Sequence, residues 1–81
     1  MQVIYLLRKR KEESMDKSLL EEKMAKNGFS NEELANRLGI DAATFYRKKK
    51  GESDFYRREI QIIKKLLQLS NEEVDIIFFA N

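Results

Sequence analysis

The chain has 81 residues, enough for one domain with a single small hydrophobic core. Apolar residues make up 42% of it and charged residues 37%, which is typical of a folded helical domain and not of a disordered tail. It contains no cysteine and no histidine, which excludes disulfides, zinc sites of the usual Cys/His kind and imidazole general bases. No apolar run is long enough to span a bilayer, and the apolar opening precedes the first basic residues, the reverse of a secretory signal. We therefore expect a cytoplasmic protein without a membrane segment.

The net charge of +2 is unevenly distributed along the chain. Residues 42–65 carry eight basic and three acidic side chains, whereas residues 15–41 carry four basic and six acidic ones. A positive field over the middle of the chain favours an anionic partner there.

The first two predicted helices are bounded by local signals. Residues 16–27 read as a helix with Leu20 and Met24 on one side, ended by Gly28. Ser30-Asn31-Glu32-Glu33 has the pattern of a capping box, in which the Ser30 and Glu33 side chains each bind the backbone amide of the other. The box predicts a second helix over residues 31–38, which Gly39 ends.

The third predicted helix, residues 42–50, has the acidic cap Asp41 at its start and four basic residues in its last turn, where cations suit the negative end of the helix. Gly51 ends it. Helix chemistry alone accounts for most of this composition.

Two further helices complete the prediction. Ile60, Ile63 and Leu67 recur on one face of a helix that begins at 56 or 57 and ends near 68. A second capping box at residues 70–73 opens a fifth helix, on which Val74, Ile77 and Phe78 share a face. The chain lacks proline, and its three glycines fall between stretches of good helix formers, so we predict an all-α fold.

The second and third helices and the turn between them have the proportions of a helix-turn-helix. Gly39 makes the turn, and Leu34, Leu38, Ile40 and Phe45 form its apolar skeleton. At this point the chain resembles the lambdoid phage repressor and Cro group, the XRE-type helix-turn-helix family, over about residues 16–79. The resemblance implies a compact five-helix lambda-repressor-like DNA-binding domain over residues 15–81, with residues 1–14 as an N-terminal extension.

One residue departs from the family pattern. Lys48 stands where family members usually have a buried aliphatic side chain. We expect its methylenes to lie on the core and its ammonium to extend outward.

The resemblance also implies which residues touch DNA. The outer face of the third helix would enter the major groove and read bases, with Arg47 on guanine as the strongest candidate. Phosphates would be held at the start of the second helix, at the end of the third and in the link after it. The implied base-reading residues are Ala42, Ala43, Thr44, Tyr46, Arg47 and Lys48, and the implied phosphate contacts are Ser30, Asn31, Lys49, Lys50 and Ser53.

Both ends of the chain carry further candidates. The sequence IIFFAN near the C-terminus has more large apolar residues than one helix face needs. Family members usually dimerise through this region, so we expect a homodimer in which Ile76 and Phe79 lie at the interface. Residues 8–11, all basic, could form an arm on DNA, or the extension could continue as a helix into residue 16.

The expected function is sequence-specific binding of a double-stranded DNA operator by a transcriptional regulator, most simply a repressor of a phage or other mobile element. No glycine-rich phosphate loop or pairing of nucleophile and base points to an enzyme, and the resemblance implies no cofactor. The alternative is a protein-interaction module, such as an antitoxin or anti-repressor, on the same fold. Exposed apolar side chains on the third helix would favour that alternative, and basic ones DNA.

Overall fold

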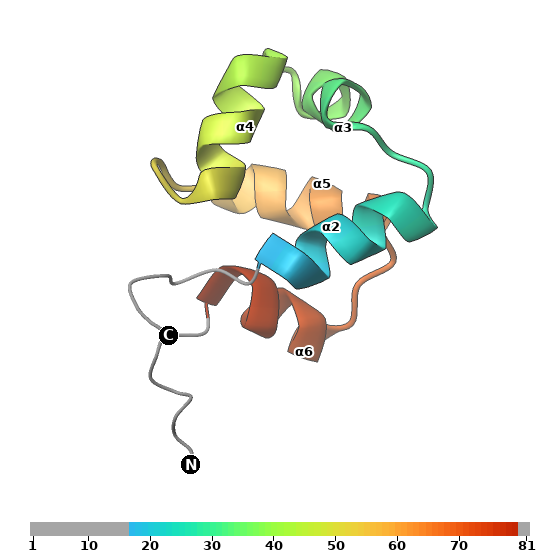
Figure 1. Cartoon of the computed structure of the whole chain (residues 1–81). Helices are drawn as coiled ribbons and strands as arrows, with labels where there is room; N and C mark the ends of the chain where they lie inside the picture. Colours follow the sequence, from blue (N-terminus) through green and yellow to red (C-terminus); the bar gives the residue numbers. More distant parts are fainter. Residues whose placement is uncertain (1–16, 80–81) are drawn as a thin grey trace.

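The computed structural model describes residues 17–79, in which the chain forms helices joined by short turns. In order these are α2 (Lys17–Lys26), α3 (Asn31–Leu38), α4 (Ala42–Lys50), α5 (Arg57–Leu66), α6 (Asn71–Val74) and the π-helical turn η2 (Asp75–Phe79). Figure 1 shows α3 and α4 at one end of the molecule, α6 at the other, and α2 and α5 between them. The predicted N-terminal extension, residues 1–14, lies outside the described residues, as does the basic run 8–11.

Both predicted capping boxes are confirmed. The Glu33 amide donates to the Ser30 hydroxyl oxygen at 3.1 Å, and the Ser30 amide donates to the Glu33 carboxylate at 2.9 Å. Ser70 and Glu73 make the same two bonds at the start of α6. These reciprocal bonds satisfy amides that a helix start leaves without intrahelical partners, which is why α3 and α6 begin where the sequence predicted.

The end of α5 differs from the prediction. The helix ends at Leu66, two residues before Gln68, which adopts a left-handed φ of 56°. This conformation, uncommon outside glycine, lets the Leu69 amide donate to the Lys64 carbonyl at 2.9 Å. Leu67 and Leu69 are both buried, so the early turn serves to direct two leucines into the core.

The last helix begins as predicted but widens to a π-helical turn at Asp75. Ile77 is fully buried, Val74 and Phe78 are half-buried, and Ile76 and Phe79 are exposed. The predicted inward face is therefore confirmed, with the two flanking residues left at the surface.

The core joins all the described helices. Edge-to-face aromatic contacts run from Phe45 of α4 to Phe55, at 5.8 Å between ring centroids, and from Phe55 to Phe78 of η2, at 5.4 Å. Phe45 is completely buried. One row of aromatic rings thus connects the end of the molecule that carries α4 with the end that carries η2. The buried apolar residues are Leu20, Met24, Leu34, Ala35, Leu38, Phe45, Ile63, Leu67, Leu69 and Ile77.

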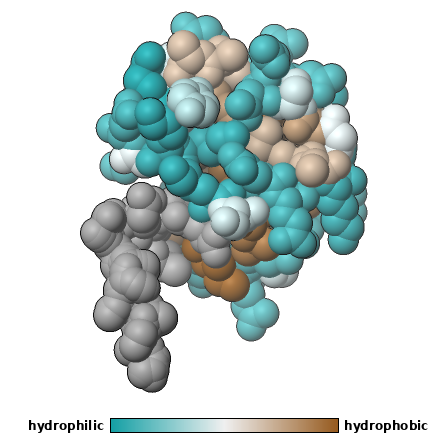
Figure 2. Space-filling view, viewed as in Figure 1, coloured by the Kyte–Doolittle hydropathy of each residue, from teal (hydrophilic) through white to brown (hydrophobic). Residues whose placement is uncertain are grey.

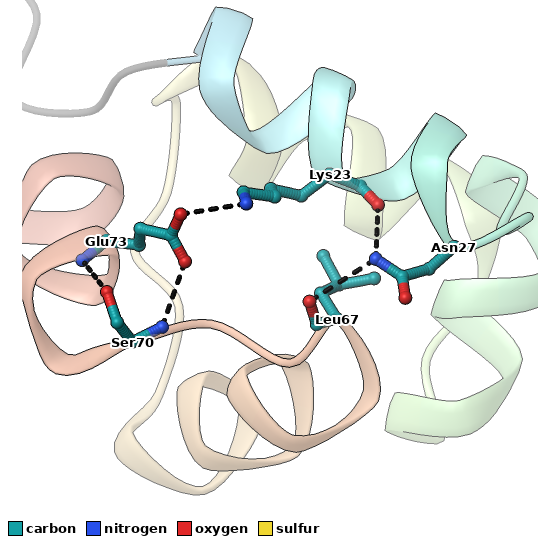
Figure 3. Close-up of polar contacts among 5 residues, drawn as sticks. All are labelled: Lys23, Asn27, Leu67, Ser70 and Glu73. Carbon is teal, nitrogen blue, oxygen red and sulfur yellow. Dashed lines mark hydrogen bonds and ion pairs between the residues drawn. The ribbon is translucent and has the colours of Figure 1, made fainter.

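A polar link holds α6 to α2 (Figure 3). One oxygen of Glu73 accepts from the Ser70 amide, and the other lies 2.8 Å from the Lys23 ammonium. The side-chain amide of Asn27 donates to the carbonyls of Lys23, at 2.8 Å, and Leu67, at 3.3 Å. We call Lys23, Ser70 and Glu73 the Glu73 clamp.

The clamp also shifts a titration. Bonding to the Lys23 ammonium, and then to the Ser70 amide, holds the pKa of Glu73 below its ordinary value of 4.5. A lowered folded-state pKa means that this contribution to stability is present above the ordinary pKa. It is lost as the pH falls through the lowered value.

Candidate nucleic-acid interface

The turn between α3 and α4 presents α4 at the outer end of the molecule. Gly39 has a left-handed φ of 78°, a conformation that costs glycine nothing sterically. Its amide donates to the Asn36 carbonyl, and the next amide, of Ile40, donates to the Ala35 carbonyl, both at 3.1 Å. These bonds close α3 and reverse the chain, while the half-buried Ile40 fills the corner. Figure 1 shows α3 and α4 beside each other, with their axes at a steep angle.

Arg47 lies on the exposed face of α4, as predicted. Its guanidinium donates to the Thr44 hydroxyl at 3.3 Å, and the Thr44 amide in turn donates to the Asp41 carboxylate at 2.7 Å. The bonds from Thr44, with Arg47 adding its charge, hold the pKa of Asp41 below its ordinary value. The carboxylate therefore stays charged at neutral pH and caps the helix.

The rest of the face is mixed in character. Ala43 and Tyr46 are exposed, whereas Ala42 and Thr44 are half-buried. The ammonium of Lys50 lies 5.1 Å from the centre of the Tyr46 ring and 3.0 Å from a Glu52 carboxylate oxygen. The hydrogen bond to Glu52, followed by its charge, raises the pKa of Lys50. Lys50 is exposed and remains positively charged.

The structure corrects the prediction that the Lys48 ammonium extends outward and reads bases. Its side chain is buried, and its ammonium lies 2.9 Å from Glu59, a carboxylate in the first turn of α5 that is only 1% exposed. The same Glu59 oxygen accepts from the Tyr56 amide at 2.8 Å, and the ammonium lies 3.8 Å from the centre of the Tyr56 ring. The expected outward direction of Lys48 is therefore wrong, and Lys48 does not belong to the exposed face of α4. A buried charge requires a partner, and Glu59 supplies it from inside the molecule.

Lys49 is also buried, against the expectation of a solvent-facing phosphate contact. Its ammonium lies 2.9 Å from the side-chain oxygen of Asn31 and 3.0 Å from a carboxylate oxygen of Glu21 on α2. Asn31, the first residue of α3, is half-buried. Ser30 is exposed, but its amide and hydroxyl are occupied by the capping box.

Ser53, in the link after α4, is exposed. The predicted phosphate contacts therefore differ in burial: Ser30, Lys50 and Ser53 are exposed, Asn31 is half-buried and Lys49 is buried. Lys50 is paired with Glu52, and Asn31 and Lys49 bind each other.

Three residues that position this surface were not predicted from the sequence. Glu59 holds Lys48, and Glu21 holds Lys49. Arg58 donates to the Leu38 carbonyl at 3.3 Å and so ties α5 to the end of α3. A signal existed for Glu59: it is the third residue of α5, the position from which a glutamate reaches back to the cap amide. No comparable signal marked Glu21 or Arg58, whose partners are distant in the sequence.

Comparison with protein families shows that residues 19–74 match the model of the Cro/C1-type HTH DNA-binding domain. The match covers more than half of the chain and includes all of α3 and α4. Comparison with curated proteins and with solved structures gives no match. No helix among residues 17–79 is long and apolar enough to cross a bilayer.

Proposed function

Because the chain belongs to the Cro/C1-type helix-turn-helix DNA-binding domain family, we propose that it regulates transcription by placing α4 in the major groove of an operator. The observation that carries the proposal is the two-sided character of α4. Phe45 is completely buried, while its neighbours Tyr46 and Arg47 are exposed. The helix is therefore anchored on one side and open on the other, as insertion into a groove requires.

Arg47 is the proposed reader of guanine, because a guanidinium can bond both O6 and N7 of that base. Its bond to Thr44 holds it along the exposed face. Ala42, Ala43 and Thr44 offer methyl groups to thymine, and Tyr46 offers a ring and a hydroxyl. Lys48 has no part in this proposal, since its ammonium is sealed against Glu59.

Lys50 and Ser53 are proposed to contact phosphates, because both are exposed near the end of α4. Asn31 and Lys49 lie together at the start of α3 and are proposed to hold a further phosphate, with Ser30 beside them. Contacts of this kind set the register of the protein on the duplex without reading sequence.

The direct test is selection of binding sites from random duplex DNA, followed by two substitutions. Arg47→Ala should relax the selected sequence at one base position and cost about 1–3 kcal/mol of binding free energy on the best site. Lys50→Ala should weaken all sequences about equally and reduce the magnitude of the salt slope by roughly 0.9. Arg47→Ala weakening every sequence alike would contradict the base-reading role.

We further propose repression as the mode of regulation, since occupying an operator requires nothing beyond DNA binding. The likeness to lambdoid repressors supports origin in a phage or other mobile element. The protein-interaction alternative is less well supported, because the large side chains exposed on α4 are Tyr46, Arg47 and Lys50, two of them basic.

The proposed homodimer would form through η2. Ile76 is 43% exposed and Phe79 is 58% exposed. Phe79 lines a shallow groove of about 450 Å³ together with the apolar residues Phe55, Ile60 and Val74 and the polar residues Arg57, Gln61 and Lys64. Figure 2 shows a mixture of hydrophilic and mildly hydrophobic residues over the end that carries α3 and α4, with the most hydrophobic surface in this view lower down, towards α6. A second copy would cover this apolar surface on the side away from the DNA.

Phe79→Lys should abolish or strongly weaken self-association, because it places a charge at the centre of the proposed apolar contact. Sedimentation velocity at several protein concentrations measures this. Asn36→Lys adds the same charge on α3, at the other end of the molecule, and should leave self-association unchanged. Equal behaviour of both variants and the unchanged protein would exclude η2 as the interface.

A further inference from the structure

Lys49 is a basic residue whose charge is covered in the free protein. Its side chain is 7% exposed, although it lies in the last turn of α4, where Arg47 and Lys50 are exposed. The ammonium lies between two oxygens, one from the Asn31 side chain at 2.9 Å and one from the Glu21 carboxylate at 3.0 Å.

The two partners of Lys49 differ in how firmly they are placed. Asn31 is half-buried and belongs to α3, so its bond keeps the ammonium at the start of that helix. Glu21 comes from α2, and its side chain is 60% exposed. Water solvates this carboxylate almost as well when it is unpaired. Because Lys49 is buried and needs a charged partner, Glu21 is exchanged for another anion and not simply released, while Asn31 keeps the ammonium in place.

We propose that Glu21 sets the overall DNA affinity of the protein by occupying Lys49 until a DNA phosphate displaces it. This inference rests on the proposed function, in which a phosphate approaches the start of α3. A phosphate oxygen and a carboxylate oxygen compete for the same ammonium, so each binding event breaks the Glu21–Lys49 pair. Since every duplex presents phosphates, the competition lowers affinity for all sequences alike and leaves the reading of bases to α4.

The competition predicts a specific coupling between two substitutions. Glu21→Gln removes the competing charge but keeps the shape, so it should tighten binding about two- to fivefold on operator and unrelated DNA alike. It should also steepen the salt slope by up to roughly 0.9, because in the unchanged protein the freed Glu21 carboxylate attracts a salt cation and offsets the cation that the neutralised phosphate releases. In a Lys49→Met background the same change should have only the effect of removing one remote negative charge.

The experiment measures affinities for the selected operator and for an unrelated duplex across a salt series. The variants are Glu21→Gln, Lys49→Met and the two combined. Glu22→Gln is the matched control, because Glu22 is an equally acidic, exposed neighbour on α2 without an ion pair among the described residues. If Lys49→Met does not fold, as thermal melting would show, Lys49→Gln replaces it in the same cycle.

The outcomes separate the two hypotheses. A Glu21→Gln gain that exceeds the Glu22→Gln gain, and vanishes without Lys49, supports the competition. A gain that equals the control, or that persists without Lys49, overturns it while DNA binding stands. Failure of the unchanged protein to bind any duplex overturns the proposed function itself, and the competition with it.

Discussion

Replacing Phe45 with alanine should lower the free energy of unfolding by about 3–5 kcal/mol, a large part of the roughly 5–15 kcal/mol typical of a whole domain. Phe45 is completely buried on α4 and meets the Phe55 ring edge to face. Its loss leaves a cavity where α4, the link and the core meet, and removes the anchor of the outer helix. Urea unfolding followed by circular dichroism measures the change.

Tyr46→Ala is the matched control for Phe45→Ala. Tyr46 is the next residue on the same helix and is 49% exposed, and the Lys50 ammonium lies 5.1 Å from the centre of its ring. Its removal should cost less than about 1 kcal/mol. Similar losses for the two variants would mean that α4 is not anchored through its inner face.

Lys48→Met should cost about 3–5 kcal/mol, because it leaves the Glu59 carboxylate buried without a countercharge. Methionine keeps most of the apolar length of lysine, so the loss reports the charge and not the packing. The double variant Lys48→Met/Glu59→Leu should recover most of the stability, since an apolar pair of similar volume can replace a buried ion pair. A double-mutant cycle on urea unfolding gives the coupling.

The exposed pair of Lys50 and Glu52 supplies the control for that cycle. Its atoms are 3.0 Å apart, nearly the same as in the Lys48 pair, yet both side chains are open to solvent. Lys50→Met should therefore cost no more than about 1 kcal/mol. A Lys48→Met loss as small as this would show that water reaches Glu59.

The helix starts were predictable because their signals lie within four residues. Ser30 and Ser70 each stand three residues before a glutamate, and the bonds that this spacing predicts are present. Gly39 and Gly51 ended their helices as expected, both with a positive φ. Such features depend on neighbouring residues alone, so the sequence states them directly.

The features that escaped prediction depend on distant partners. The resemblance places Lys48 at a position that is usually buried and aliphatic, but its pairing with Glu59 depends on how α4 and α5 cross. The same holds for Lys49, whose partners lie on α2 and α3. The early end of α5 also escaped prediction. Gln68, and not a glycine or asparagine, adopts the left-handed conformation there, since this turn buries Leu67 and Leu69.

For the interface, the family resemblance implied the outer face of α4. Of the residues it implied, Ala43, Tyr46 and Arg47 are exposed, whereas Ala42 and Thr44 are half-buried and Lys48 is buried. The resemblance could not separate the four consecutive basic residues at the end of α4 by role. In the structure two of them, Lys48 and Lys49, are buried in ion pairs, and two, Arg47 and Lys50, are exposed. Basic charge that the sequence assigns to DNA is thus partly used to hold the helices together.

The Glu73 clamp affects which operator spacing two copies of the protein would bind. One carboxylate both starts α6 and ties it to α2, so the tilt of the last helix follows the body that carries α4. In a dimer joined through η2, the spacing between the two α4 helices would depend on how α6 is oriented, and therefore on this carboxylate. The test measures affinity for operators whose spacers are lengthened or shortened by one base pair. The unchanged protein should bind them weakly, and Glu73→Gln should lose less affinity for them.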